Sequence, residues 1–174
     1  YAEILKDVPQ VRTPLVFQDL SSERLLTMSW LDGARLMTYK DAPLEQRNLI
    51  GQSLFKAWWY PFAHYGVIHG DPHLGNYTIF KEDGAPGGLN LLDYGCIRTF
   101  KPDFVQGVIN LYQGLLEEDR ARVAHAYETW GLEGLNDELI DAMSIWARFI
   151  YGPLLDDRVR AIADDVAPGD YGRK

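Results

Sequence analysis

The stretch that decides the fold is His69-Gly70-Asp71-Pro72-His73-Leu74-Gly75-Asn76, with the later tripeptide Asp93-Tyr94-Gly95. The first segment is a polar loop, and the tripeptide closes an apolar run. Between them, residues 77–80 are rich in strand formers and residues 81–88 in turn formers. This pattern predicts a β-hairpin with strands at 77–80 and 89–93 joined by a turn at 81–88.

Hairpin geometry places two of these polar residues opposite each other. If the turn is centred between Gly84 and Ala85, Asn76 faces Asp93, with Cα atoms about 4.5–5.5 Å apart. The loop that carries Asp71 emerges at the same open end of the hairpin. We therefore expect an amide and two carboxylates to converge there.

Oxygen ligands of this kind suit a hard cation such as Mg²⁺, which proteins bind through one or two carboxylates plus substrate phosphates. Phosphoryl transfer needs such a metal and an acid that can accept a proton. The pattern H-x-D-x-x-x-x-N followed by a strand-terminal D-x-G matches the catalytic-loop and metal-loop pattern of kinases. The combined spacing predicts Mg-dependent phosphoryl chemistry.

Around this hairpin the chain alternates strand and helix patterns. Residues 1–32 read as short strands and turns, with one buried strand at 24–30. Residues 43–65 read as a long helix that starts at Pro43, contains Pro61 and stops at Gly66. Residues 102–151 read as three further helical segments. The pattern predicts an α+β fold.

Composition narrows the class of protein. With 174 residues, a net charge of −8 and 47% hydrophobic residues, the chain is of ordinary globular composition. A length prior of about 150 residues per domain favours one domain. The acidic balance and scattered bases argue against a nucleic-acid partner. A single cysteine, Cys96, favours a reducing compartment, and we expect a cytoplasmic location.

Residues 64–98 resemble the UbiB/AarF family of atypical, protein-kinase-like proteins. The resemblance lies in the catalytic-loop segment 69–76 and in segment 91–95, which ends in the triplet Asp93-Tyr94-Gly95. Residues 23–28 with Asp32-Gly33 resemble that family's last N-lobe strand and hinge. The resemblance implies a kinase-like fold: residues 1–32 as a remnant of the nucleotide-binding N-lobe and hinge, and residues 33–174 as the helical catalytic C-lobe. It also implies ATP and Mg as cofactors and ATPase activity. A further implication is a role in coenzyme Q (ubiquinone) biosynthesis, with an isoprenoid or quinone lipid at a membrane periphery.

The same resemblance assigns roles to individual residues. Asp71 is expected to be the catalytic aspartate, and His73 to touch phosphate. Asn76 and Asp93 are expected to hold Mg²⁺, and His69 to act as a scaffold histidine. The hinge whose backbone meets the adenine is expected at Met28, Ser29, Trp30 and Leu31.

Two features depart from ordinary kinases. No G-x-G-x-x-G motif and no V-A-I-K-like lysine occur before residue 20, so we expect the phosphate-binding half upstream of Tyr1 and the chain to be a piece of a longer protein. Gly70 replaces an arginine, and the segment from Gly95 to Pro102 is short, so a conventional protein kinase is not expected. Two alternatives stay open: a small-molecule phosphotransferase of the aminoglycoside or choline kinase type, and a non-catalytic pseudokinase scaffold. The oligomeric state is not predicted.

Overall fold

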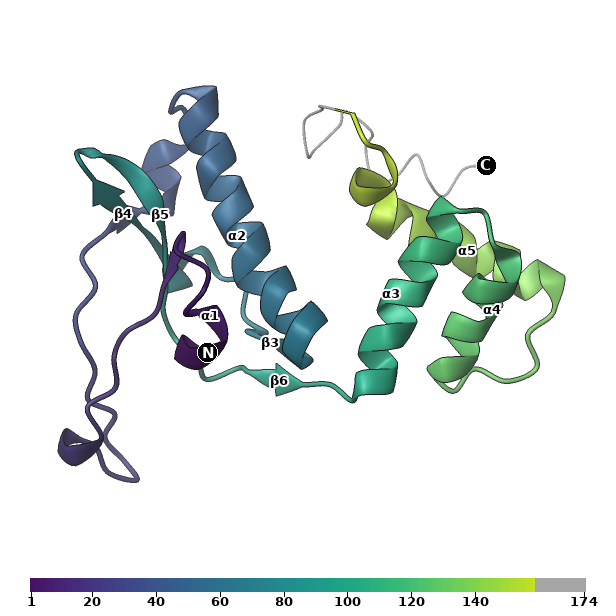
Figure 1. Cartoon of the computed structure of the whole chain (residues 1–174), viewed down its shortest axis with the longest axis horizontal. Helices are drawn as coiled ribbons and strands as arrows, with labels where there is room; N and C mark the ends of the chain where they lie inside the picture. Colours follow the sequence, from purple (N-terminus) through teal and green to yellow (C-terminus); the bar gives the residue numbers. More distant parts are fainter. Residues whose placement is uncertain (159–174) are drawn as a thin grey trace. The chain divides into compact units, whose positions relative to one another are not determined.

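A computed structural model describes residues 1–158 and divides the chain into two compact units, Tyr1–Val105 and Gln106–Lys174 (Figure 1). The length of the chain favours one domain, but the structure has two compact units. The N-lobe and C-lobe regions expected at 1–32 and 33–174 follow a different, functional division, and that division stays a prediction. Residues 159–174 of the second region lie outside the described part.

The first unit is built around one long helix. After the short helix α1 (Ala2–Leu5), α2 spans Leu44–Tyr65, as the sequence predicts. Pro43 precedes its first turn, where a missing N–H costs nothing. Gly66 ends it in the left-handed conformation (φ 64°), which glycine adopts without strain. A proline inside a helix usually kinks or ends it, but helical backbone continues past Pro61 to Tyr65.

A four-stranded sheet packs against α2. Its order is β1 (Val11–Arg12), β5 (Ala85–Leu91), β4 (Tyr77–Glu82) and β2 (Ala34–Arg35); β1 runs parallel to β5, and the other pairs are antiparallel. One face of the hairpin β4–β5 supplies alternate side chains to the core, as strand periodicity requires. The buried core consists of Leu5, Val8, Val11, Ile50, Ala57, Tyr77, Ile79, Leu89 and Leu91.

The hairpin turn differs from the prediction. β4 and β5 are joined by only two residues, Asp83 and Gly84, both with positive φ (50° and 84°), as a type I′ hairpin turn requires. The stretch read as turn is therefore mostly strand, with a register irregularity next to Phe80. The main register pairs Tyr77 with Leu91. Asn76 is consequently opposite Leu92, and the predicted Asn76–Asp93 pairing was wrong by one residue.

An extended arm connects β1 to β2. Residues 13–32 fold back on themselves through a bridge between Val16 and Met28 and a short 3₁₀ turn at Gln18–Leu20. The buried strand predicted at 24–30 was wrong, because Leu25 and Trp30 are 60% and 85% exposed. A second 3₁₀ turn, Leu36–Tyr39, follows β2.

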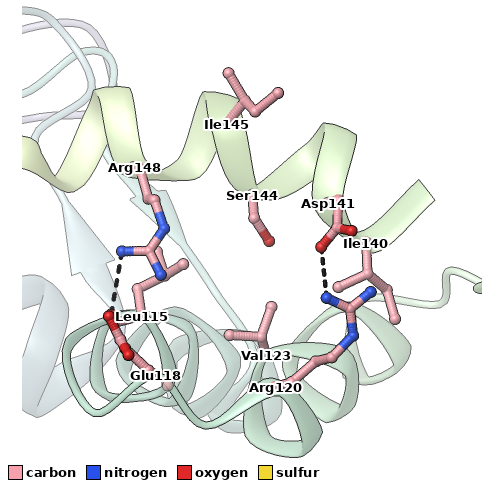
Figure 2. Close-up of a pocket in the computed structure, with 10 residues that line it drawn as sticks. Leu115, Glu118, Arg120, Val123, Ile140, Asp141, Ser144, Ile145 and Arg148 are labelled. Atoms are coloured by element: carbon pink, nitrogen blue, oxygen red, sulfur yellow. Dashed lines mark hydrogen bonds and ion pairs between the residues drawn. The ribbon is translucent and has the colours of Figure 1, made fainter. Parts of the chain in front are cut away.

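The second unit is helical, as predicted from residue 102 onward. α3 (Pro102–Leu116) runs into it, followed by α4 (Arg120–Thr129) and α5 (Asp137–Leu155). Asp119 and Asn136 cap α4 and α5 by accepting backbone N–H bonds at 3.0 and 2.8 Å. Arg120 ties α4 to α5 through Asp137 and Asp141, beside a cavity of about 360 Å³ (Figure 2). The buried core consists of Leu111, Leu115, Val123, Ala126, Tyr127, Ile140 and Ala147.

The hairpin turn predicts a glycine-specific effect on stability. Gly84→Ala should lower the free energy of unfolding by about 1–2 kcal/mol, the cost of a left-handed conformation in a residue with a Cβ. No atom lies near the added Cβ, so the effect is conformational. Gly51, equally open but inside α2, is the control: Gly51→Ala should stabilise by about 0.5–1 kcal/mol. Urea unfolding measures both, and equal signs would contradict the turn assignment.

Candidate functional site

Two short strands set the base of the candidate site. β3 (Val67–Ile68) follows α2 directly and pairs antiparallel with β6 (Arg98–Thr99). The loop 69–76 leaves β3, and the loop 92–97 leads into β6, so the two loops start from one small sheet. At Gly70 they come into contact: a Cβ there would lie 2.1 Å from the carbonyl oxygen of Cys96, and φ is 79°. Glycine is therefore required at this position in place of the arginine of ordinary kinases.

His69 connects the same two loops from inside. Its side chain is fully buried, and its ring nitrogens lie 3.2 Å from the carbonyl oxygen of Asp71 and 3.1 Å from that of Leu92. Aromatic rings surround it, with ring centroids 5.7–6.2 Å away: Tyr1, Trp58, Tyr77 and Tyr94. This position agrees with the expected scaffold role. The imidazole links the backbone of Asp71 in one loop to the backbone of Leu92, the residue before Asp93, in the other.

Asp71 is held by two donors of its own loop. Its Oδ1 accepts the backbone N–H of His73 at 3.1 Å, and its Oδ2 accepts the side-chain amide of Asn76 at 2.8 Å. These bonds, the His73 N–H first, lower the pKa of Asp71 from its usual 3.8. The side chain is therefore an oriented carboxylate at neutral pH.

Asn76 and Asp93 lie at the open end of the hairpin, as predicted, although one residue out of register. Asn76, in the 3₁₀ turn Leu74–Asn76, is 9% exposed, and its carbonyl accepts the N–H of Leu92 at 2.8 Å. Because its amide nitrogen donates to Asp71, its amide oxygen is the group left to bind a cation. Asp93 follows Leu92 with a φ of 56°, and one oxygen accepts the Gly95 N–H at 3.0 Å. Its second oxygen and its exposure suit a cation ligand.

The available oxygen ligands suit an open Mg²⁺ site, not a metal site that protein side chains enclose completely. In residues 1–158 no group of three or more His, Cys, Asp or Glu side chains is placed to hold a metal. A site made of Asp93 and the Asn76 amide oxygen leaves coordination positions for phosphate oxygens and water, which Mg²⁺ retains. These residues therefore fit a metal that arrives with a nucleotide.

His73 is exposed on the loop surface. Its Nδ1 accepts the N–H of Gly75 at 3.1 Å, so in the neutral ring the proton sits on Nε2. An outward N–H donor at this place is compatible with the predicted phosphate contact.

Two of the four predicted hinge residues line a cavity. Trp30 and Leu31 line a cavity of about 480 Å³ together with residues of β4 and β5. Met28 and Ser29 do not line it. Ser29 instead pairs with Leu15, donating its N–H at 2.8 Å and accepting through Oγ at 2.9 Å.

Sequence reasoning missed the residue at the base of this cavity, Asn90. It is 1% exposed and donates its amide to the carbonyl of Asp32 at 3.0 Å and to Thr78 Oγ1 at 2.9 Å. Its side-chain oxygen is buried and has no hydrogen-bond partner among residues 1–158. The signal in the sequence was an amide between two leucines, Leu89 and Leu91, because alternation points it to the face opposite the core.

A second missed contact supports the catalytic loop. Trp58 donates its indole N–H to the hydroxyl of Tyr77 at 2.8 Å, and that hydroxyl donates to the carbonyl of Asp71 at 3.3 Å. Trp58 thus connects α2 to the loop that carries Asp71.

A loop closed by an Asp–Asn hydrogen bond, a hairpin, and a D-x-G triplet after its second strand define a protein-kinase-like catalytic region. The family comparison agrees: residues 1–127 match the ABC1 atypical kinase-like domain, and the chain belongs to that family.

Named relatives are similar over most of the chain. The chloroplastic protein ACTIVITY OF BC1 COMPLEX KINASE 8 of Arabidopsis thaliana is 25% identical over 76% of this chain. The mitochondrial atypical kinase COQ8 of Saccharomyces cerevisiae is 28% identical over 60% of it. The chain spans only 17% and 20% of those two proteins.

A solved structure supports the fold. The Rv3197 protein of Mycobacterium tuberculosis, determined with erythromycin, aligns with a TM-score of 0.61 at 18% identity. The alignment covers 98% of this chain and 47% of that one. At this identity the likeness supports the kinase-like fold alone.

Gly70→Ala should separate the two loops. The added Cβ meets a backbone carbonyl and a left-handed backbone, so we expect a loss of about 2–4 kcal/mol in the free energy of unfolding. Gly84→Ala is the matched control, since it shares the positive φ but has open surroundings. A loss at Gly70 no larger than at Gly84 would contradict the contact with Cys96.

Asn76→Ala should raise the pKa of Asp71 toward 3.8, because it removes the second of the two donors. The carboxylate's contribution to stability is present above the unfolded pKa and is lost as pH falls through the lower folded value. As the pH falls, Asn76→Ala should therefore lose that contribution at a higher pH than the unaltered chain does. Carboxyl-carbon NMR titration measures the pKa, with Asn90→Ala as a control that leaves it unchanged. An unchanged pKa in Asn76→Ala would show that the amide does not hold Asp71.

Proposed function

We propose that this chain is the catalytic-loop part of a Mg-ATP-binding atypical kinase or ATPase. The observation that supports this most directly is the hydrogen-bonded connection from Asp71 through Asn76 to Leu92. It brings the carboxylate of the catalytic loop and the start of the metal triplet to one end of the hairpin.

Asp71 is proposed to orient the acceptor hydroxyl or a water molecule. Its lowered pKa keeps it ionised at neutral pH, so it accepts a hydrogen bond from the nucleophile and receives the proton as the oxygen attacks. The two donors from His73 and Asn76 fix the direction of the carboxylate and reduce the reorganisation needed at that moment.

Asn76 and Asp93 are proposed to hold Mg²⁺ through the amide oxygen and the outer carboxylate oxygen. The bound metal would neutralise charge on the transferred phosphoryl group. His73 is proposed to donate from Nε2 to a phosphate oxygen. Gly70 and His69 keep the two loops in contact, so they act as positioning residues.

The cavity beside Trp30 and Leu31 is the proposed site of the nucleotide base. Asn90, which lines this cavity, is hydrogen-bonded to Thr78 of β4. Thr78 is two residues after Asn76 in the chain, a distance of about 7 Å at the usual rise of a strand. The buried, unpartnered oxygen of Asn90 offers an acceptor for an amino group on a ligand, or for a bound water.

The wider role is proposed from the family resemblance. An ATPase-like accessory function in coenzyme Q biosynthesis, with an isoprenoid or quinone lipid as partner, is consistent with relatives named as mitochondrial and chloroplastic kinases. Within residues 1–158 no helix is both long enough and apolar enough to span a bilayer. The cytoplasmic location and the peripheral membrane contact stay predictions.

Calorimetric titration with ATP, with and without Mg²⁺, tests the proposal. Asp93→Asn should abolish the Mg-dependent part of binding. Asp71→Asn should leave binding and lower turnover by roughly 10²–10⁴, the usual contribution of acid–base catalysis. Asp83→Asn is a matched control, because Asp83 is also an exposed aspartate with positive φ (50°, against 56° at Asp93).

The outcomes separate the alternatives. Binding that ignores both Mg²⁺ and Asp93→Asn would overturn the proposal. Mg-dependent binding without turnover would favour a pseudokinase scaffold. Phosphorylation of a soluble alcohol would favour a small-molecule phosphotransferase.

A further inference from the structure

Helix α5 has two apolar faces, and the described residues of the helical unit bury one of them. The buried face packs against α3 and α4 through Ile140, Met143, Ala147, Tyr151 and Leu155. A helix that is apolar on two sides is expected to be covered on both. The second face therefore requires an explanation.

The second face, here called the α5 stripe, runs along the helix at spacings of three and four residues. Leu139, Trp146 and Ile150 in it are 43%, 68% and 69% exposed. The stripe consists of Leu139, Ala142, Trp146, Phe149, Ile150 and Pro153. Alternating three- and four-residue steps are the spacing with which one helix packs along another.

The stripe is distinct from the cavity of the helical unit. Figure 2 shows Ser144, Asp141 and Arg148 of α5 directed to the side of α3 and α4, where they line that cavity. One turn of helix thus carries cavity residues on one side and Trp146 of the stripe on another.

Charge at the two ends of α5 limits what can cover the stripe. Its first turns carry Asp137, Glu138 and Asp141, and Asp156 and Asp157 follow its end. Among the described residues, Arg120 pairs with Asp137 and Asp141, and Arg158 pairs with Asp156. Residues 106–158 contain ten Asp and Glu against four Arg.

This distribution disfavours two occupants. In a second copy of the chain, parallel or antiparallel pairing of α5 would bring acidic ends together, which costs free energy. An anionic lipid surface prefers helices with a basic polar face, and α5 has the opposite charge. A helix with positive charge at both ends meets neither penalty.

We propose that the α5 stripe docks an amphipathic helix of a partner protein, with apolar residues at three- and four-residue spacing and Lys or Arg at both ends. The apolar residues would cover Trp146 and Ile150, and the basic ends would face the acidic ends of α5. The proposal is independent of the nucleotide site, because it uses the helical unit alone.

A synthetic helical peptide tests the docking. The probe is a 21-residue fluorescent peptide with leucines at heptad a and d positions and lysines at both ends. Its anisotropy is measured with the 174-residue chain. Trp146→Asp should weaken binding at least about tenfold, as loss of an aromatic anchor does. Leu132→Asp, in the loop between α4 and α5 and 39% exposed, should change it less than about twofold.

A peptide with glutamates in place of the lysines should bind at least about tenfold more weakly, since like charges then meet at both ends. Circular dichroism confirms that the variants stay folded. Equal binding of both peptides, or equal loss in both variants, would overturn the proposal.

Other occupants give different results, and each overturns it. Sedimentation showing a dimer lost in Trp146→Asp would assign the stripe to a second copy. Trp146-dependent binding to phosphatidylcholine–phosphatidylglycerol vesicles without peptide binding would assign it to lipid. Peptide binding only after removal of residues 159–174 would assign it to the chain's own end.

Discussion

The arrangement of the candidate site depends on one buried imidazole. His69 contacts the carbonyl oxygens of Asp71 and Leu92, two residues of different loops that lie 21 positions apart in the sequence. The imidazole is fully buried inside a shell of aromatic rings, so these carbonyls are the hydrogen-bond partners of its ring nitrogens, and a buried polar group without a partner is costly. The imidazole therefore makes the two loops energetically dependent on each other. Gly70 completes the constraint, because it lets the backbones approach closely.

The register of the hairpin carries this constraint to the chemistry. Because side chains alternate along a strand, a slip of one residue would exchange Leu89 and Leu91 of the core with Asn90 of the opposite face. The two-residue turn at Asp83-Gly84 and the register shift next to Phe80 together set this register. They therefore decide which residue faces Asn76: the pairing is with Leu92, and Asp93 extends just beyond the strand, where a left-handed backbone turns it outward.

The two faces of the hairpin β4–β5 thus have different surroundings. One face is buried on α2 and provides stability, whereas the other carries Asn90, held by a hydrogen bond to Thr78, to the cavity beside Trp30 and Leu31. A similar division occurs on α5, where one face forms the core of the helical unit and another stays exposed. In both elements, two faces of one backbone segment have different surroundings, because only one of them packs into a core.

The sequence alone predicts the positions of the main helices and places Asp71, Asn76 and Asp93 in the loops at the open end of one hairpin. These follow from local signals: periodicity, Pro43 and Gly66 at helix ends, and short spacing between the motif residues. Only the tertiary structure decided the turn, the exposure of the arm at residues 24–30 and the partners of His69 and Asn90. Several glycines between 84 and 88 could have formed the turn, and the choice depends on how the strands pack on α2. Hydrogen bonds between distant loops leave no periodic trace in the chain, so their partners become visible only when the backbone is folded.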